Sequence, residues 1–183
     1  MTLSHRPLRS ALYIPGSKPR ALEKARNLPT DSIIFDLEDA VSAESKSEAR
    51  AILHAALAQG GYGARLKIVR INALDTPWGK ADLQALDGLD LDAVLLPKVN
   101  SAGDLDALVD VVGAKWPLWA MLETPLGILN AGEIAAYPLL QALVAGTNDL
   151  AKDLKCQLTL TRDSLQMALQ ALVLAARAHD VAL

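Results

Sequence analysis

The chain has 183 residues, of which 51% are hydrophobic and 21% charged, and its formal net charge is −3. This composition is typical of a folded globular domain and argues against disorder. The mixed charge argues against a nucleic acid or a membrane as partner, and the apolar runs are too short to span a membrane. The single cysteine, Cys156, cannot form an internal disulfide. We expect a cytoplasmic protein without a signal peptide.

Apolar runs alternate with helical patterns along the chain. Strands are predicted, in chain order, at residues 9–14, 32–37, 65–71, 92–99, 117–126 and 143–150, with 181–183 as the start of another. The first predicted helix is capped by Ser17 and includes Leu28, the second runs from a capping box at Ser45 to Gln59, and the third runs from Thr76-Pro77 to Leu86. The later helices are predicted from Ser101 through Val112, over 126–136 and over 159–179, and the last of these is the longest.

Such alternation implies right-handed βαβ units and a parallel sheet. The length of each unit is close to that of a unit in an eight-unit barrel. The predicted fold class is therefore α/β, a TIM (β/α)8-type barrel that stops after about six units. We expect residues 1–183 to form one barrel domain, without the C-terminal units and lid.

Ionisable or amide side chains follow each predicted strand. They are Lys18 and Arg20, Glu38 and Asp39, Arg70 and Asn72, Lys98, Glu123, and Asn148 and Asp149. Because the carboxyl ends of barrel strands meet at one mouth, this pattern predicts a site there.

Glu123 and Asp149 are the candidate metal ligands. Each is predicted at the end of an apolar run, on neighbouring strands. Mg²⁺ prefers oxygen ligands and usually takes only one or two carboxylates. The alternative is that each acid interacts with the start of the following helix. We favour the metal, because two like charges side by side are costly without a cation.

Other polar residues have two interpretations each. Arg70 is suited to binding a substrate carboxylate in a bidentate manner, or it forms a surface salt bridge. The turn over residues 15–20 offers helix N-terminal amides and two cations to a phosphate, or is a solvated helix start. Glu38 and Asp39 orient metal-bound water, or are helix N-terminal charges.

Lys98 raises the rival chemistry of a Schiff-base aldolase, which needs a desolvated amine. Nearby carboxylates would keep that amine protonated, so we disfavour this alternative. Cys156 has no evident histidine partner. The three histidines are poor ligand candidates because they fall on the N-terminal tail and on helices: His5, His54 and His179.

Six segments resemble the citrate lyase β-subunit-like (CitE-like) branch of the HpcH/HpaI aldolase superfamily. They cover nearly the whole chain in the same order, and together they are specific. The segments are LYIPGSKPR at 12–20, FDLEDAV at 35–41, VRIN at 69–72, LPKV at 96–99, LETPLG at 122–127 and AGTNDL at 145–150.

The resemblance implies a TIM barrel that binds Mg²⁺ through Glu123 and Asp149. It also implies that Arg70 holds a substrate carboxylate, with Glu38 and Asp39 close to the metal and available as bases. The residues expected to bind substrate, including the phosphates of coenzyme A, are Pro15, Gly16, Lys18, Arg20, Gly146 and Asn148.

The implied activity is carbon–carbon cleavage or condensation of 3-hydroxy-diacyl thioesters such as citryl-, malyl- or citramalyl-CoA, with an oxo acid and an acetyl thioester as products. The carrier is coenzyme A or a carrier protein, and a homo-trimer or hexamer is expected. Members of this branch continue past the position of Leu183. The alternatives are an aldolase for free hydroxy-oxo acids and a non-catalytic binding or assembly subunit.

Overall fold

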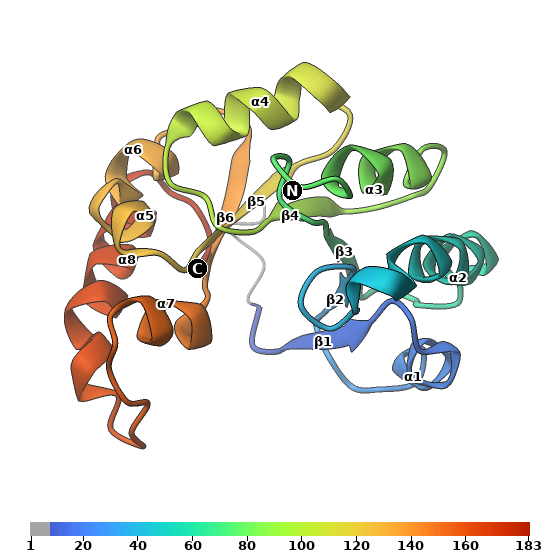
Figure 1. The fold of residues 1–183 in the computed structure, drawn as a ribbon, viewed down its shortest axis with the longest axis horizontal. Coiled ribbons are helices and arrows are strands. Elements are labelled where there is room, and N and C mark those ends of the chain that lie inside the picture. The colour runs from blue at the N-terminus through green and yellow to red at the C-terminus, as the bar shows by residue number, and fades with distance from the viewer. Residues whose placement is uncertain (1–7) are drawn as a thin grey trace. The chain divides into compact units, whose positions relative to one another are not determined.

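The computed structural model describes residues 8–183, which divide into two compact units, Leu8–Leu95 and Leu96–Leu183 (Figure 1). Each unit is built from strands that alternate with helices, as the sequence predicted. None of the helices formed by residues 8–183 is long and apolar enough to cross a membrane. That residues 1–183 form one domain stays a prediction.

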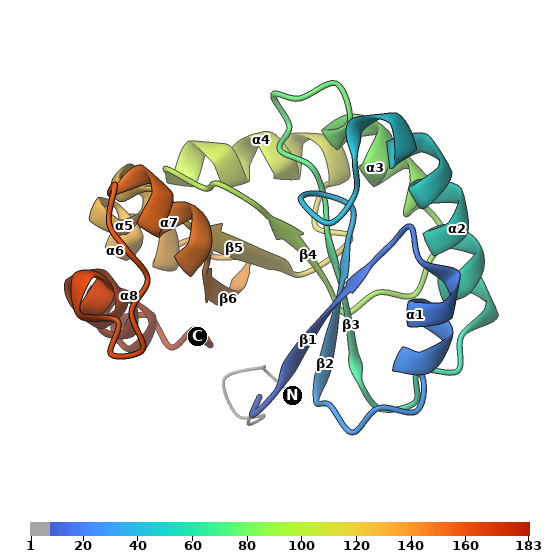
Figure 2. The ribbon, with the colours of Figure 1, turned by 60° about the horizontal axis from the view of Figure 1, so that its bottom comes forward.

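The first unit contains a parallel sheet whose strands pair in chain order. The strands are β1 (Ala11–Pro15), β2 (Ser32–Asp36), β3 (Leu66–Arg70) and β4 (Ala93–Leu96). The helices between them are α1 (Pro19–Ala25), α2 (Lys46–Gln59) and α3 (Gly79–Ala85). Figure 2 shows these helices along one side of the strands, which is the arrangement that right-handed βαβ units produce.

The core of the first unit centres on β2, which is buried over its whole length. A strand covered on both faces reads as a near-continuous apolar run, and β2 follows this rule between its first residue, Ser32, and its last, Asp36. Phe35 packs edge-to-face against Tyr62, with ring centroids 5.0 Å apart and an interplanar angle of 73°. Leu53 of α2 is 1% exposed. The carboxylate that ends β2 therefore lies at the border of an apolar core.

Asp31 links the segment before β2 to the segment before β1 through hydrogen bonds and an ion pair. Its carboxylate accepts from Arg9 Nη2 at 2.8 Å and Nε at 3.2 Å, and from the backbone N–H groups of Arg9 and Ser10 at 2.9 and 3.2 Å. The hydrogen bond from the Arg9 side chain is the main reason why the pKa of Asp31 is lowered from 3.8 to about 2. The ionised form is thus the one that the fold favours.

This lowered pKa predicts an acid-sensitive contribution to stability. A carboxyl whose pKa is lower in the folded state stabilises the fold above its unfolded-state pKa, and the contribution is lost as the pH falls from about 4 through about 2. We expect Asp31→Asn to be less stable than the wild type at neutral pH and the difference to shrink across this window. Urea unfolding at a series of pH values measures it; a constant difference contradicts the assignment.

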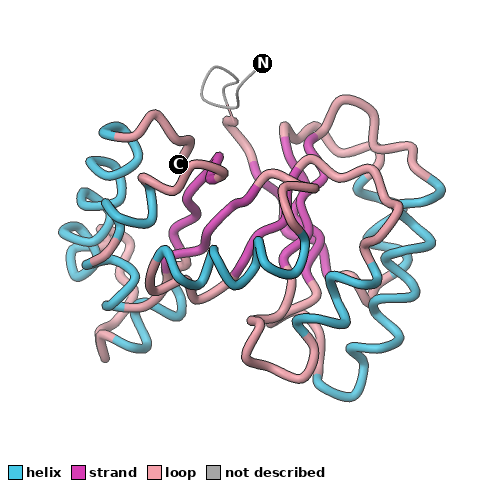
Figure 3. The backbone as a smooth tube through the Cα atoms, turned by 90° about the horizontal axis from the view of Figure 1, so that it is seen from above, coloured by secondary structure: helices cyan, strands magenta, loops and turns pink. Residues whose placement is uncertain are grey.

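The second unit contains the parallel pair β5 (Leu118–Leu122) and β6 (Leu140–Ala145). Its helices are α4 (Ala102–Val112), α5 (Pro125–Leu129), α6 (Ala131–Ala135), α7 (Thr147–Asp153) and α8 (Gln166–Ala178). Figure 3 shows strands flanked by helices in the backbone trace. Ala182 bridges Ala142 in parallel, so the predicted start of another strand at 181–183 is confirmed.

Three predicted helix starts are wrong. Ser17 does not cap α1, because Lys18 is the N-cap residue and makes no side-chain capping bond. Ser45 does not form a capping box, because its backbone is already helical (φ −93°, ψ −4°) and its side chain makes no capping bond. Thr76 does not start α3, which begins at Gly79. The Thr76 hydroxyl donates to a backbone carbonyl of the preceding turn at 2.6 Å.

Two predictions of helix length are also wrong. The segment 126–136 forms two short helices, α5 and α6, that meet at Asn130. The Asn130 side chain donates to the carbonyl of Asn100 at 2.7 Å, which fixes the chain at this break. The last helix, α8, begins at Gln166 and has 13 residues, whereas α2 has 14.

Candidate functional site

Glu123 follows directly after β5 and is only 3% exposed. The backbone N–H of Lys98 donates to its Oε1 at 3.0 Å. The cap of the next helix is formed by Thr124, whose hydroxyl oxygen accepts from the Gly127 N–H at 3.0 Å. Glu123 is therefore not the helix cap that the alternative interpretation required, and its carboxylate belongs to the loop that contains Lys98.

Gly146 makes room for this carboxylate. Its N–H donates to the carbonyl of Leu122 at 3.1 Å. A Cβ atom at Gly146 would overlap Oε2 of Glu123 and lie 2.5 Å from the Glu123 Cβ. A residue with a side chain cannot stand there unless Glu123 moves, so the glycine allows the Glu123 side chain to pack directly against the backbone.

Asp149 reaches the same place from a helix, not from a strand. The strand β6 ends at Ala145, and Asp149 lies in the first turn of α7. The strand predicted over 143–150 is confirmed only as far as Ala145, because the apolar run gives way at Gly146 to polar residues that start a helix. The Asp149 side chain is 31% exposed. Asn148, next to it, is exposed.

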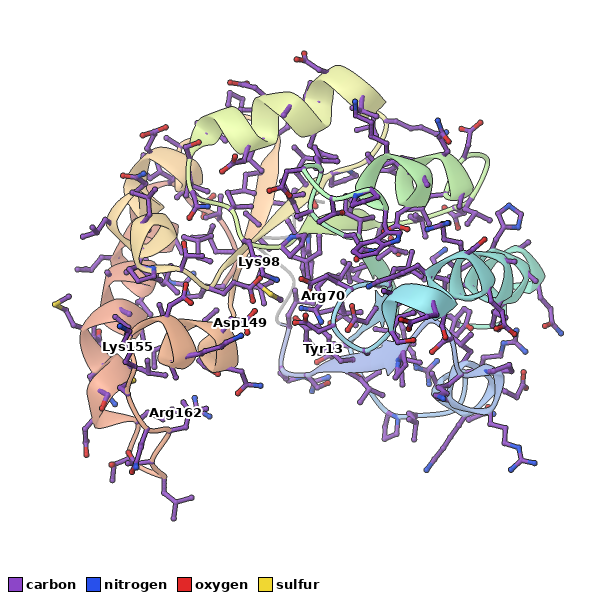
Figure 4. The ribbon with its side chains drawn as sticks, viewed as in Figure 1. Tyr13, Arg70, Lys98, Asp149, Lys155 and Arg162 are labelled. Carbon is purple, nitrogen blue, oxygen red and sulfur yellow. The ribbon has the colours of Figure 1, made fainter. Side chains whose placement is uncertain are left out.

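The ammonium of Lys98 lies close to both carboxylates. Its Nζ is 4.0 Å from Glu123 Oε1 and 3.5 Å from Asp149 Oδ2. Figure 4 shows Lys98 and Asp149 side by side. The Lys98 backbone has φ +54°, a left-handed conformation that is uncommon for any residue other than glycine. The two acids predicted to share a cation thus share the charge of one lysine.

This arrangement fits a divalent cation. Among residues 8–183, no group of three or more His, Cys, Asp or Glu side chains is arranged to hold a metal ion, but Mg²⁺ usually takes only one or two carboxylates and leaves other positions to water and substrate. Glu123 and Asp149 already share an ammonium, so one positive charge lies within 4.0 Å of both carboxylates. These are the carboxylates that would hold the ion.

In the first unit, Arg70 forms ion pairs with three acids. Its Nε and Nη2 bind the two oxygens of Asp36 at 2.8 and 2.6 Å. Its Nη1 lies 2.7 Å from Glu38 Oε2 and 3.4 Å from Asp39 Oδ2. Burial lowers the pKa of Arg70, but the hydrogen bonds and charges of these acids outweigh it and raise the pKa above its ordinary value. The guanidinium also lies 5.5 Å from the ring centre of Tyr13 (Figure 4).

The bidentate partner of Arg70 is therefore Asp36 of the chain itself. Sequence reasoning brought Arg70, Glu38 and Asp39 together correctly but gave Asp36 no role. The available signal was an aspartate at the end of an otherwise apolar strand. A substrate carboxylate that approached Arg70 would have to compete with Glu38 and Asp39 for Nη1, so substrate binding by Arg70 stays a prediction.

Lys46 holds the loop that carries Glu38. Its ammonium donates to the carbonyl of Leu37 at 2.8 Å and to that of Glu38 at 2.7 Å. The Asn72 side chain donates to the Leu37 carbonyl as well, at 2.9 Å. Burial is the main reason why the pKa of Lys46 is lowered, against the opposing charges of nearby acids that include Asp82. Sequence reasoning missed Lys46, because a lysine at a helix start gives no sign of burial.

The turn after β1 packs against the same loop. The Gly16 N–H donates to the carbonyl of Asp36 at 2.8 Å, while Lys18 and Arg20 are exposed. Binding of a phosphate by Pro15, Gly16, Lys18 and Arg20 stays a prediction. The remaining candidates lie on or beside helices: His54 on α2, Cys156 after α7 and His179 at the end of α8; His5 lies outside the described residues.

Residues 9–183 match the family described as HpcH/HpaI aldolase/citrate lyase. The chain is 53% identical over 175 residues to a (3S)-malyl-CoA thioesterase of Cereibacter sphaeroides, a match that covers 96% of this chain and 61% of the relative. It is 39% identical over 167 residues to an L-malyl-CoA/beta-methylmalyl-CoA lyase of Cereibacter sphaeroides, covering 84% of this chain and 52% of that enzyme. The chain thus spans less than two thirds of the length of either relative.

A solved structure matches the whole chain. It is the citrate lyase beta subunit of M. tuberculosis complexed with oxaloacetate and magnesium, with a TM-score of 0.82, 29% sequence identity, and coverage of 100% of this chain and 79% of that one. Together with the parallel βα units, this likeness confirms both the predicted TIM-barrel fold class and the resemblance to the citrate lyase β-subunit branch.

Proposed function

Because the chain belongs to the HpcH/HpaI aldolase/citrate lyase family, we propose that it carries the catalytic site of a Mg²⁺-dependent enzyme for CoA thioesters of 3-hydroxy diacids. The observation that supports this most directly is the pair Glu123 and Asp149, whose carboxylates share the ammonium of Lys98. Two relatives are named for malyl-CoA, and the similar solved structure contains magnesium and an oxo acid. Malyl-CoA is the substrate that these names favour.

Glu123 and Asp149 would hold the ion. A divalent cation held there would polarise a substrate carbonyl oxygen and stabilise the negative charge that develops on it. The chain orients Glu123 before any metal is bound, because the Lys98 N–H donates to one oxygen and Gly146 lets the side chain lie against the backbone. Neighbouring groups that orient a metal-coordinating side chain in this way raise the affinity of the site for the metal.

In the first unit, the group proposed to bind a substrate carboxylate is Arg70. Asp36 fixes the plane of the Arg70 guanidinium by binding Nε and Nη2, and a substrate carboxylate would have to displace Glu38 or Asp39 from Nη1. Glu38 and Asp39, which lie against Nη1, are the candidates to take up a proton. The exposed cations of the turn at Lys18 and Arg20 suit the phosphates of coenzyme A.

The first reaction that we propose is hydrolysis of the thioester. The oxygen of water adds to the thioester carbonyl, the carbon–sulfur bond breaks, and coenzyme A leaves as its thiol after it takes up the proton from water. This reaction is supported by the 53% identity to a malyl-CoA thioesterase over 96% of the chain.

The second candidate is the carbon–carbon cleavage expected from the sequence. A base removes the proton of the 3-hydroxyl group, the bond between carbons 2 and 3 breaks, and the acetyl-thioester enolate then takes up a proton. This reaction is supported by the relative named as a malyl-CoA lyase and by the solved citrate lyase subunit. Both reactions place negative charge on an oxygen of the substrate, so the proposed metal site would suit either one.

Product analysis distinguishes the reactions. We expect the purified protein to convert malyl-CoA with Mg²⁺ into malate and free coenzyme A, and the conversion to stop when a chelator removes the metal. Chromatography with mass detection would instead show glyoxylate and acetyl-CoA if the protein is a lyase. Cleavage of free hydroxy-oxo acids alone would favour the aldolase alternative, and binding without any product would favour a non-catalytic subunit and contradict the proposal.

A further inference from the structure

We propose that the ammonium of Lys98 is a resident counter-ion of the Glu123–Asp149 site. It neutralises the two carboxylates when no metal is bound, and it competes with the divalent cation for them. This inference rests on the proposed metal site, and it assigns Lys98 a role in setting how tightly the metal binds.

The first support comes from charge and burial. Glu123 is 3% exposed, and an ionised carboxylate in such a place is unfavourable unless a donor or a cation compensates it. The backbone N–H of Lys98 supplies the donor, and the ammonium of the same residue lies 4.0 Å from the carboxylate. One residue therefore compensates Glu123 through two of its groups, and it reaches Asp149 as well, at 3.5 Å.

The second support comes from the backbone. Lys98 is left-handed (φ +54°), a conformation that costs free energy in a residue with a side chain and persists only where the surroundings enforce it. Here the Lys98 carbonyl accepts from the Asn100 side chain at 3.0 Å, and the Val99 N–H donates to the carbonyl of Met121 at 3.1 Å. These bonds fix the place from which the ammonium reaches the two acids.

The third support comes from the geometry of the ammonium. Its separations from the two carboxylates, 3.5 and 4.0 Å, are longer than those of close charge-assisted hydrogen bonds. The Lys98 side chain is 41% exposed, and lysine is a flexible side chain that is well hydrated in water. The ammonium is thus held loosely enough to move into solvent. A divalent cation that takes its place gains the attraction of both acids but must first displace this charge.

The test compares Mg²⁺ binding by calorimetry in Lys98→Met, Lys98→Arg and the wild type. We expect Lys98→Met to bind Mg²⁺ about tenfold more tightly, which corresponds to about 1.4 kcal/mol. Its melting temperature without metal should fall, because the two acids then repel each other, and Mg²⁺ should restore it. Lys98→Arg keeps the charge and should bind Mg²⁺ as the wild type does. Lys152→Met, an exposed lysine of α7, is the matched control for loss of one charge.

Equal or weaker Mg²⁺ binding by Lys98→Met would overturn the inference, and so would an equal gain in Lys98→Arg or in Lys152→Met. These results leave the proposed function untouched, because they concern the strength of a metal site that the wild type still shows. Absence of Mg²⁺ binding in the wild type overturns the metal site itself, and with it both proposals. Circular dichroism of each variant confirms that it is folded before the titration.

Discussion

Replacement of Glu123 by Gln is expected to lower the Mg²⁺-dependent turnover of malyl-CoA by roughly 100-fold or more. The substitution removes one of the two negative charges that would hold the ion but keeps the shape of the side chain and an oxygen to accept from the Lys98 N–H. Mutation of groups that only support a metal ligand typically costs about 10- to 100-fold in affinity or activity. Loss of a ligand charge should exceed that range.

The matched control is Glu133→Gln. Glu133 is an exposed residue of α6 in the same unit, and its Oε1 accepts from the Ala102 N–H at 3.1 Å. The chemical change is identical, so any effect of lost charge or of the amide itself appears in both variants. Turnover should be retained in Glu133→Gln. Equal turnover in the two variants over a range of Mg²⁺ concentrations would show that Glu123 has no part in the reaction.

Replacement of Arg70 by Met is expected to destabilise the protein by about 3–5 kcal/mol, the usual cost when one partner of a buried ion pair is removed. The Arg70 side chain is 8% exposed and that of Asp36 is 3% exposed. Methionine fills much of the same volume but leaves Asp36 and Glu38 without their cation at the edge of the core. Urea unfolding of the variant and the wild type measures the difference in the free energy of unfolding.

Two further variants test whether the planar guanidinium group of Arg70 is needed for stability. Arg70→Lys keeps the charge but lacks the planar group that binds both oxygens of Asp36, so an intermediate loss is expected. Arg20→Met removes an exposed cation of α1 and should change the free energy of unfolding little. If Arg70→Met proves as stable as Arg20→Met, the acids around Arg70 do not depend on it, and the described cluster has no role in folding.

The apolar periodicity was sufficient to predict the order of the strands. The strand β5 consists entirely of buried apolar residues, β2 and β3 are apolar at most of their positions, and glycines such as Gly60 end helices where expected. Helix starts were less predictable. Ser45 and Thr76 have side chains that can cap a helix, but neither does so. The backbone of Ser45 is already helical, and the Thr76 hydroxyl donates to a backbone carbonyl of the preceding turn.

The site was only partly predictable for a related reason. Glu123 could be proposed as a candidate metal ligand because it is a single acid that follows a buried strand. Asp149 was assigned to the right place but to the wrong element, since a strand and the helix after it share one apolar run in the sequence. The pairing of Arg70 with Asp36 joins residues that are 34 positions apart, and no local pattern indicates which acid an arginine will meet.

Lys98 and Lys46 illustrate what a sequence leaves out. Both are lysines beside predicted strands or helices, yet one lies between two carboxylates and the other is buried against two backbone carbonyls. Their environments are created by residues that are distant in sequence. A left-handed lysine such as Lys98 is especially hard to anticipate, because the conformation is intrinsically unfavourable for its residue type.

Electron paramagnetic resonance with Mn²⁺ tests the central claim most directly, since Mn²⁺ takes the same oxygen ligands as Mg²⁺. The free ion gives a signal that disappears on binding, so a titration counts the sites in the protein without any need for turnover. We predict one Mn²⁺ per chain, displaced by Mg²⁺, and loss of this site in Glu123→Gln. A wild type that leaves all Mn²⁺ free, or a Glu123→Gln variant that binds it unchanged, would contradict the assignment of Glu123 and Asp149 as a metal site.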